Sequence, residues 1–150
     1  MSDLKIRKKR MKPLLKIRKI QLDQEALALM QIQQVKRQKM DELMENQRKY
    51  LDGVEKLNQH RQTLQQGMLL TVEESVDHIR NKWHLTLHQL REIEQREKAQ
   101  MANVLVARKN LQAIEKLEER YGVGIAQEER RLEQQALDET ASRLFVQQRS

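Results

Sequence analysis

A long stretch without helix breakers constrains this chain more than any other feature. After Pro13 there is neither proline nor glycine until Gly53, and proline is tolerated in the first turn of a helix. The residues between them are mostly good helix formers, with Gln, Leu, Lys and Glu abundant. We therefore predict one long helix over residues 13–66.

Apolar residues recur every seven positions along this predicted helix. One series is strongly apolar and its companion is mixed: Leu15, Leu22, Leu29, Lys36, Leu43, Tyr50, Leu57 and Leu64, with Ala26, Gln33, Met40, Gln47, Val54, Arg61 and Met68. Such repeats are typical of coiled coils, in which two helices bury their apolar stripes against each other. The polar members weaken the core and favour control of register over stability.

A turn and a second helix are predicted next. Gly67, and Thr71 placed three residues before Glu74 as in a capping box, indicate a turn at about residues 65–71. Two further heptad series follow: Val76, Trp83, Leu90, Glu97, Val104, Leu111 and Glu118, with Ile79, Thr86, Ile93, Gln100, Ala107, Ile114 and Tyr121. The glycines after Tyr121 predict that this helix ends near Arg120.

The matched lengths of the two predicted helices favour folding back within one chain over parallel homodimerisation, which stays the structural alternative. The predicted fold class is all-α: a long two-helix antiparallel coiled-coil hairpin with a flexible basic N-terminus and a short C-terminal helix. The predicted organisation is a basic arm at residues 1–12, the hairpin at 13–121 and a C-terminal helical tail at 125–148.

Positive charge is concentrated at the N-terminus. The chain carries a formal net charge of +7, and nine Lys or Arg stand against one Asp within residues 1–20. Such an arm suits nucleic acid, an anionic membrane or an acidic protein surface, and charge alone does not choose among them. No aromatic residue within the arm is available to stack on bases, so we do not expect nucleic-acid binding.

The residue inventory argues against an enzyme. There is no Cys, no apolar stretch near the ~20 residues of a membrane span, and no cleft on a two-helix fold to hold catalytic groups. His84 and His88 have metal-binding spacing but lack a third ligand, and Gly122-Val-Gly124 lacks the third glycine of a dinucleotide loop. We expect a cytoplasmic non-enzyme without metal or cofactor.

Three stretches carry a family resemblance: Met11-Lys-Pro-Leu-Leu-Lys-Ile-Arg, Leu117-Glu-Glu-Arg, and Glu133-Gln-Gln-Ala-Leu-Asp-Glu-Thr-Ala-Ser-Arg. Together they resemble the FliJ family of flagellar type III export proteins, whose members end in a Glu-Gln, Leu-Asp-Glu, Ala, Arg pattern. The resemblance extends over nearly the whole chain. It implies a component of flagellum biogenesis that is similar to the central stalk subunit of rotary ATPases.

The resemblance also implies partners and a location. They are the hexameric export ATPase FliI, whose assembly the family promotes, the export gate protein FlhA, and export chaperones. The protein would be monomeric alone and peripheral at the inner face of the cell membrane, held there through the export apparatus.

Carried onto this chain, the resemblance implies two binding surfaces. The predicted ring-binding residues are Lys8, Lys9, Arg10, Lys12, Leu15, Arg18, Leu132, Leu137 and Arg143. The predicted gate-binding residues are Leu43, Tyr50, Val72, Val76, Ile79 and Trp83. Tyr50 and Trp83 occupy heptad core positions, so packing in the core competes with a docking role. Asn46 departs from the family, where a second Tyr can stand.

Three other functions remain open at the level of sequence. The first is the equivalent stalk of a virulence type III secretion system. The second is a self-associating structural coiled coil, which a dimeric molecular weight in solution would indicate. The third is a basic nucleic-acid-binding coiled coil, whose binding would fall steeply with salt.

Overall fold

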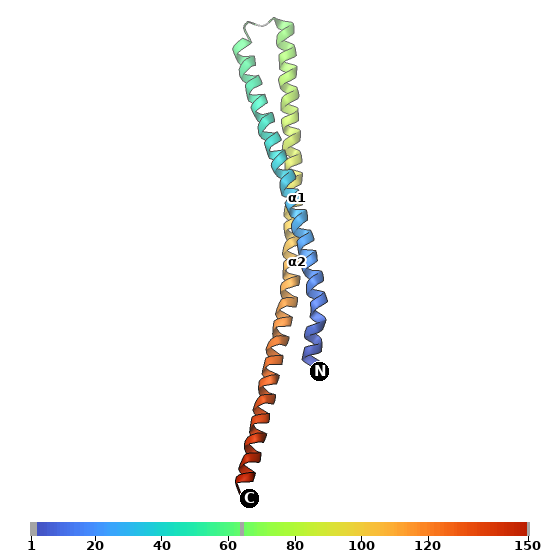
Figure 1. The fold of residues 1–150 in the computed structure, drawn as a ribbon. Coiled ribbons are helices and arrows are strands. Elements are labelled where there is room, and N and C mark those ends of the chain that lie inside the picture. The colour runs from blue at the N-terminus through green and yellow to red at the C-terminus, as the bar shows by residue number, and fades with distance from the viewer. Residues whose placement is uncertain (1–2, 64, 150) are drawn as a thin grey trace. The chain divides into compact units, whose positions relative to one another are not determined.

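The structure, a computed structural model, describes residues 3–63 and 65–149 and contains two helices (Figure 1). Helix α1 is Asp3–His60 with 58 residues, and α2 is Gln66–Arg149 with 84 residues. No strand occurs among the described residues. The prediction of two long helices that pack against each other is confirmed.

Helix α1 begins earlier than predicted. Residues 3–12 are its first turns, so the structure does not show the predicted separate, flexible arm in this part of the chain. Asp3 lies in the first turn, where a carboxylate is favourable at the positive end of the helix dipole, and it pairs with Arg7 at 3.2 Å. Pro13 lies inside the helix, which continues across it.

Helix α1 ends at His60 and α2 begins at Gln66, so the predicted turn at residues 65–71 is wrong for the part that α2 occupies. Thr63 donates hydrogen bonds to the His60 carbonyl from its backbone N–H at 3.0 Å and from its hydroxyl at 3.1 Å. Thr71 is inside α2, and its hydroxyl donates to the Gly67 carbonyl four residues back. It therefore does not cap the helix, because its oxygen is used within a helical turn.

Helix α2 continues through Gly122 and Gly124, so the predicted end near Arg120 and the separate helix at 125–148 are wrong. Neither glycine has the positive φ of a helix stop. Both lie where α1 comes close: a Cβ at Gly124 would be 3.1 Å from Leu4 Cδ1, and one at Gly122 would be 3.5 Å from Lys8 Nζ. These glycines permit close packing instead of ending the helix.

The chain divides into two compact units, and each contains part of both helices. We call Glu25–Val104 the hairpin unit, and Met1–Gln24 with Leu105–Ser150 the terminal unit. The hairpin unit buries Leu57, Val76, Leu90, Ile93 and Val104, and the terminal unit buries Ala107 and Leu111. Both predicted heptad series of α2 are buried or half-buried, as predicted.

On α1, one predicted heptad series is right and the other is wrong. The described members of the Leu15 series are half-buried or buried, and Leu64 lies outside the described residues. In the companion series, Ala26, Gln33, Met40, Gln47, Arg61 and Met68 are exposed and only Val54 is half-buried. The core positions are instead Glu25, Ile32, Lys39 and Asn46, one residue earlier. This set is less apolar than the predicted companion series. It can face α2 because its polar side chains have hydrogen-bond partners there.

Within the described residues, neither helix contains a segment long and apolar enough to cross a membrane.

Candidate functional site

A groove lined by lysines lies between α1 and α2 in the terminal unit. It has a volume of about 290 Å³ and is lined by Lys5, Lys8, Lys9, Lys12, Glu118 and Ile125. A neighbouring groove of about 550 Å³ adds Leu15 and Lys19 from α1, and Glu115, Glu119 and Val123 from α2. One wall is therefore cationic, the other partly acidic, and the floor apolar.

Four α1 members of the predicted ring-binding set line these two grooves, namely Lys8, Lys9, Lys12 and Leu15. Lys8 and Leu15 are half-buried in the grooves, and the exposed Lys9 and Lys12 line the smaller one. Arg10 is exposed and lines neither groove. Arg18 is half-buried, and its Nη1 donates a hydrogen bond to Gln21 Oε1 at 3.1 Å.

The α2 members of that set do not join them. Lys5 pairs with Glu129 at 3.3 Å, and every described side chain of α2 after Glu128 is exposed. Residues 130–149 thus extend past the beginning of α1, as the red end of α2 shows in Figure 1. Leu132 is 52% exposed and Leu137 is 64% exposed on this extension, which also carries Arg143.

The extension presents an apolar face that does not continue the interhelical core. The core positions of α2 continue every seven residues from Ile125 and Glu128. The next of them is Leu132, which is apolar, but those that follow are polar: Gln135, Glu139 and Ser142. The apolar residues instead gather at Leu137, Ala141 and Leu144, spaced by four and three residues on one side of the helix. A longer α1 would therefore leave this face uncovered.

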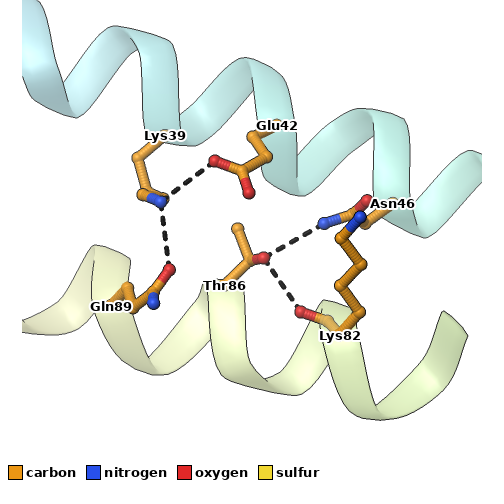
Figure 2. A network of polar contacts seen from close by, with 6 residues as sticks. All are labelled: Lys39, Glu42, Asn46, Lys82, Thr86 and Gln89. Atoms are coloured by element: carbon orange, nitrogen blue, oxygen red, sulfur yellow. Dashed lines mark hydrogen bonds and ion pairs between the residues drawn. The ribbon is translucent and has the colours of Figure 1, made fainter. Parts of the chain in front are cut away.

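The hairpin unit has a hydrogen-bonded polar layer in its core (Figure 2). Asn46 is 4% exposed and Thr86 is 2% exposed. Asn46 Nδ2 donates to Thr86 Oγ1 at 3.0 Å, and Thr86 Oγ1 donates to the Lys82 carbonyl at 2.9 Å. No buried side-chain nitrogen or oxygen of the described residues lacks a partner, so this layer is compatible with a dry core.

Further polar contacts cross the same unit. Lys39 Nζ donates to Gln89 Oε1 and pairs with Glu42, both at 3.0 Å (Figure 2). Lys36 pairs with Glu97 at 3.0 Å, and Gln100 donates to the carboxylate and the carbonyl of Glu25. The partners on α2 rise in residue number from Thr86 to Gln100 as those on α1 fall from Asn46 to Glu25, so the two helices are antiparallel within this unit.

The predicted gate-binding residues belong mainly to the core of the hairpin unit. Val76 is buried at 7% exposure, and a Cβ at Gly53 would be 3.2 Å from its Cγ2. The other five, Leu43, Tyr50, Val72, Ile79 and Trp83, are half-buried. The Tyr50 and Trp83 rings stack across the two helices, with centroids 5.5 Å apart and an interplanar angle of 26°, and both residues stay half-buried.

Sequence reasoning missed the Asn46 and Thr86 pair. Thr86 stood in a predicted core series, but Asn46 did not, because the companion series of α1 was placed one residue too late. The available signal was Thr86 itself, since a buried hydroxyl in an apolar series needs a polar partner on the facing helix.

The described residues contain no group of three or more His, Cys, Asp or Glu placed to hold a metal ion. His88 Nε2 lies 3.2 Å from Glu92 Oε1, an exposed contact within one helix. Arg48 hydrogen-bonds Glu45 on the surface of α1, which lowers the pKa of that carboxyl and raises the pKa of the guanidinium.

Comparison with family models identifies a family for this chain. The family model described as "Flagellar FliJ protein" matches residues 7–150, essentially the whole chain. No curated protein and no solved structure matches.

Proposed function

Since this chain belongs to the FliJ family and is thus a component of flagellar type III export, we propose that it acts as the central stalk of the export ATPase ring. In this role it promotes assembly of the hexamer of FliI. The terminal unit enters the ring, and the hairpin unit remains available to the gate protein FlhA and to chaperones. Peripheral association with the inner face of the membrane follows from these contacts.

The apolar face at the end of α2 carries the proposal. Leu137 and Leu144 are exposed, and their face does not coincide with the core that pairs α2 with α1. Exposed apolar residues of this kind mark surfaces that bind a partner. The same unit presents the exposed cations Lys9, Arg10 and Lys12, so the terminal unit offers both apolar and cationic groups, and the cations would complement acidic side chains in the pore of a ring.

A helix pair has no six-fold symmetry, so it touches the subunits of a six-fold ring unequally. Unequal contacts favour different nucleotide states in different subunits, because a ligand shifts an equilibrium only by its differential affinity for the two states. The stalk would act through this difference, and the chemistry of hydrolysis would remain that of the ATPase.

For the gate, the five half-buried residues of the hairpin unit are the proposed contacts. Tyr50 and Trp83 form the stacked pair at its centre, and large aromatic side chains are common anchors in interfaces. Val76 supports them from the core and is not proposed to touch the gate itself.

The test of the stalk is ATP hydrolysis and hexamer formation by the cognate ATPase, with and without this protein. In one variant, Lys8, Lys9, Arg10 and Lys12 are changed to Glu. The matched control changes four exposed cations of the hairpin unit to Glu: Arg37, Lys49, Lys56 and Arg61. We expect stimulation by the wild type and the control and its loss in the first variant. No stimulation by the wild type at any ratio would refute the stalk and favour a self-associating structural coiled coil.

A further inference from the structure

The first turns of α1 carry a second apolar stripe, on the side that faces away from α2. The residues that face α2 are Leu4, Met11, Leu15 and Leu22, all half-buried. Ile17 follows Leu15 by two residues, about 200° around the helix. Ile17 is 50% exposed and Ile20 is 46% exposed. The outer stripe consists of Ile6, which is half-buried, and of Pro13, Ile17 and Ile20, with Leu14 at its border. Arg10 lies on the same side between Ile6 and Ile17, and its long side chain can extend from the stripe toward the headgroups.

Cations border this stripe on both sides. Lys9, Lys12, Lys16 and Lys19 are spaced by three, four and three residues and therefore form a ladder along one border. Arg7 and Arg18 stand along the other border. The four ladder lysines have no ion-pair partner within the described part of the chain. Asp3 is the only acidic residue of this segment before Asp23.

We propose that this surface binds the interface of an anionic phospholipid bilayer. An apolar stripe between two rows of cations is the pattern of helices that lie in the plane of a membrane, with the apolar face among the headgroups and the cations on anionic lipid. The stripe from Ile6 to Ile20 is about 21 Å long. The protein lies on the membrane through this face and does not cross it.

The shape of the surface favours a bilayer over an acidic protein. The stripe is on the convex outer side of one helix, and a fluid bilayer accepts a convex helix without a matching groove. A protein ligand gains more from a concave site, and in the grooves of this unit Glu118 interrupts the positive charge. Of the outer stripe, Ile20 lines one of these grooves, while Ile6, Pro13 and Ile17 line none of the three.

This inference goes beyond the proposed stalk and can fail separately. Ile17, Ile20, Lys16 and Lys19 are not among the proposed ring-binding residues. Lys9 and Lys12 belong to both surfaces, so bilayer and ring compete for them, and the protein held at the membrane is the form not yet engaged with the ring.

The experiment is cosedimentation of the full-length protein with phosphatidylcholine vesicles, with and without phosphatidylglycerol as the anionic lipid. One variant carries Ile17→Gln and Ile20→Gln, and a second carries Lys16→Gln and Lys19→Gln. The matched control carries Met44→Gln and Leu85→Gln. It removes two apolar side chains of the hairpin unit that are even more exposed than Ile17 and Ile20. Circular dichroism verifies that all four proteins remain helical.

We expect binding to anionic vesicles only, weakened by added salt, and unchanged in the control. Each of the two variants should bind about tenfold more weakly. Absence of binding by the wild type, equal binding to neutral vesicles, or equal loss in the control would overturn the proposal. A second result would also overturn the proposal: the protein binds polyglutamate but no vesicles, and this binding is lost with Lys16 and Lys19 but not with Ile17 and Ile20. That result would assign the surface to an acidic protein.

Discussion

Helix α2 contains two segments of comparable apolar content, residues 76–104 and residues 130–148. Only the first of them has buried side chains. In the first, apolar residues recur at core positions that face α1, and polar residues such as Thr86 find partners there. In the second, apolar residues gather on another side and all described side chains are exposed. Apolar content allows a helix to bind a partner. The side on which its apolar residues lie decides whether that partner is the other helix of the same chain or another molecule.

The comparison predicts a large difference between two leucines of α2. Leu90→Ala should lower the free energy of unfolding by about 2–4 kcal/mol, because it opens a cavity at a residue only 6% exposed. Leu137→Ala should change it by less than about 0.5 kcal/mol, because Leu137 is 64% exposed. Urea denaturation followed by circular dichroism measures both. Equal losses would mean that the end of α2 folds against its own chain.

The polar layer allows a test of what the core specifies. Asn46→Ala should cost about 1–2 kcal/mol, since it removes a buried hydrogen bond to Thr86. Changing Asn46→Leu together with Thr86→Val should restore stability or raise it, but weaken the preference for a single register and for the monomer. Light scattering after gel filtration detects the resulting oligomers. The exposed neighbour Gln47 provides the control as Gln47→Ala, and a strictly monomeric double variant would contradict the role in register.

Replacing a glycine by alanine should have a smaller effect on stability, and one that differs between the two units. Gly122→Ala in the terminal unit should stabilise the protein by about 0.5–1 kcal/mol, since Ala favours the helix and its Cβ meets Lys8 Nζ at an ordinary 3.5 Å. Gly53→Ala in the hairpin unit should give less or destabilise, because its Cβ would be 3.2 Å from Val76 Cγ2. Thermal unfolding compares the two variants, and an equal gain at both positions would show that the hairpin unit is loosely packed.

The smallest effect concerns the surface pair of Glu45 and Arg48. Because Arg48 lowers the folded-state pKa of Glu45, its contribution to stability is present above the unfolded pKa and disappears as the pH falls through the lowered value. Glu45→Gln should therefore lower the melting temperature slightly at neutral pH and not at all in strong acid. The effect is small because the pair is exposed to solvent. A larger loss in acid than at neutral pH would contradict this sign.

Most of the fold could be predicted from local sequence, and the errors concern glycines and the less apolar core series. The Leu15 series and both series of α2 were identified because strong heptads need no knowledge of a partner. Gly122 and Gly124 were interpreted as a helix stop, although Leu4 and Lys8 lie against them and the helix continues. Thr71 was interpreted as a cap, although it lies inside α2 and its hydroxyl donates a hydrogen bond to the Gly67 carbonyl.

The candidate surfaces were predictable only in part. The cations of α1 were evident from composition, and two residues of the predicted ring-binding set, Lys8 and Leu15, line one groove together with Lys19. Their role in binding a ring stays a prediction. Burial of Val76 at the centre of the gate-binding set was not evident, since a heptad position does not say how far the facing helix covers it. The opposite placement of Ile17 and Leu15 follows from helical geometry once the side facing α2 is known.

The sequence alone determined that this chain is helical, that it folds through long apolar stripes, and that its positive charge is concentrated in the first turns of α1. These properties depend on residues close together along the chain. Only the tertiary structure decided that Asn46 and not Gln47 faces Thr86, that α2 continues for about twenty residues past the beginning of α1, and which apolar faces remain exposed. Register and exposure depend on the facing helix, so no window of sequence contains them.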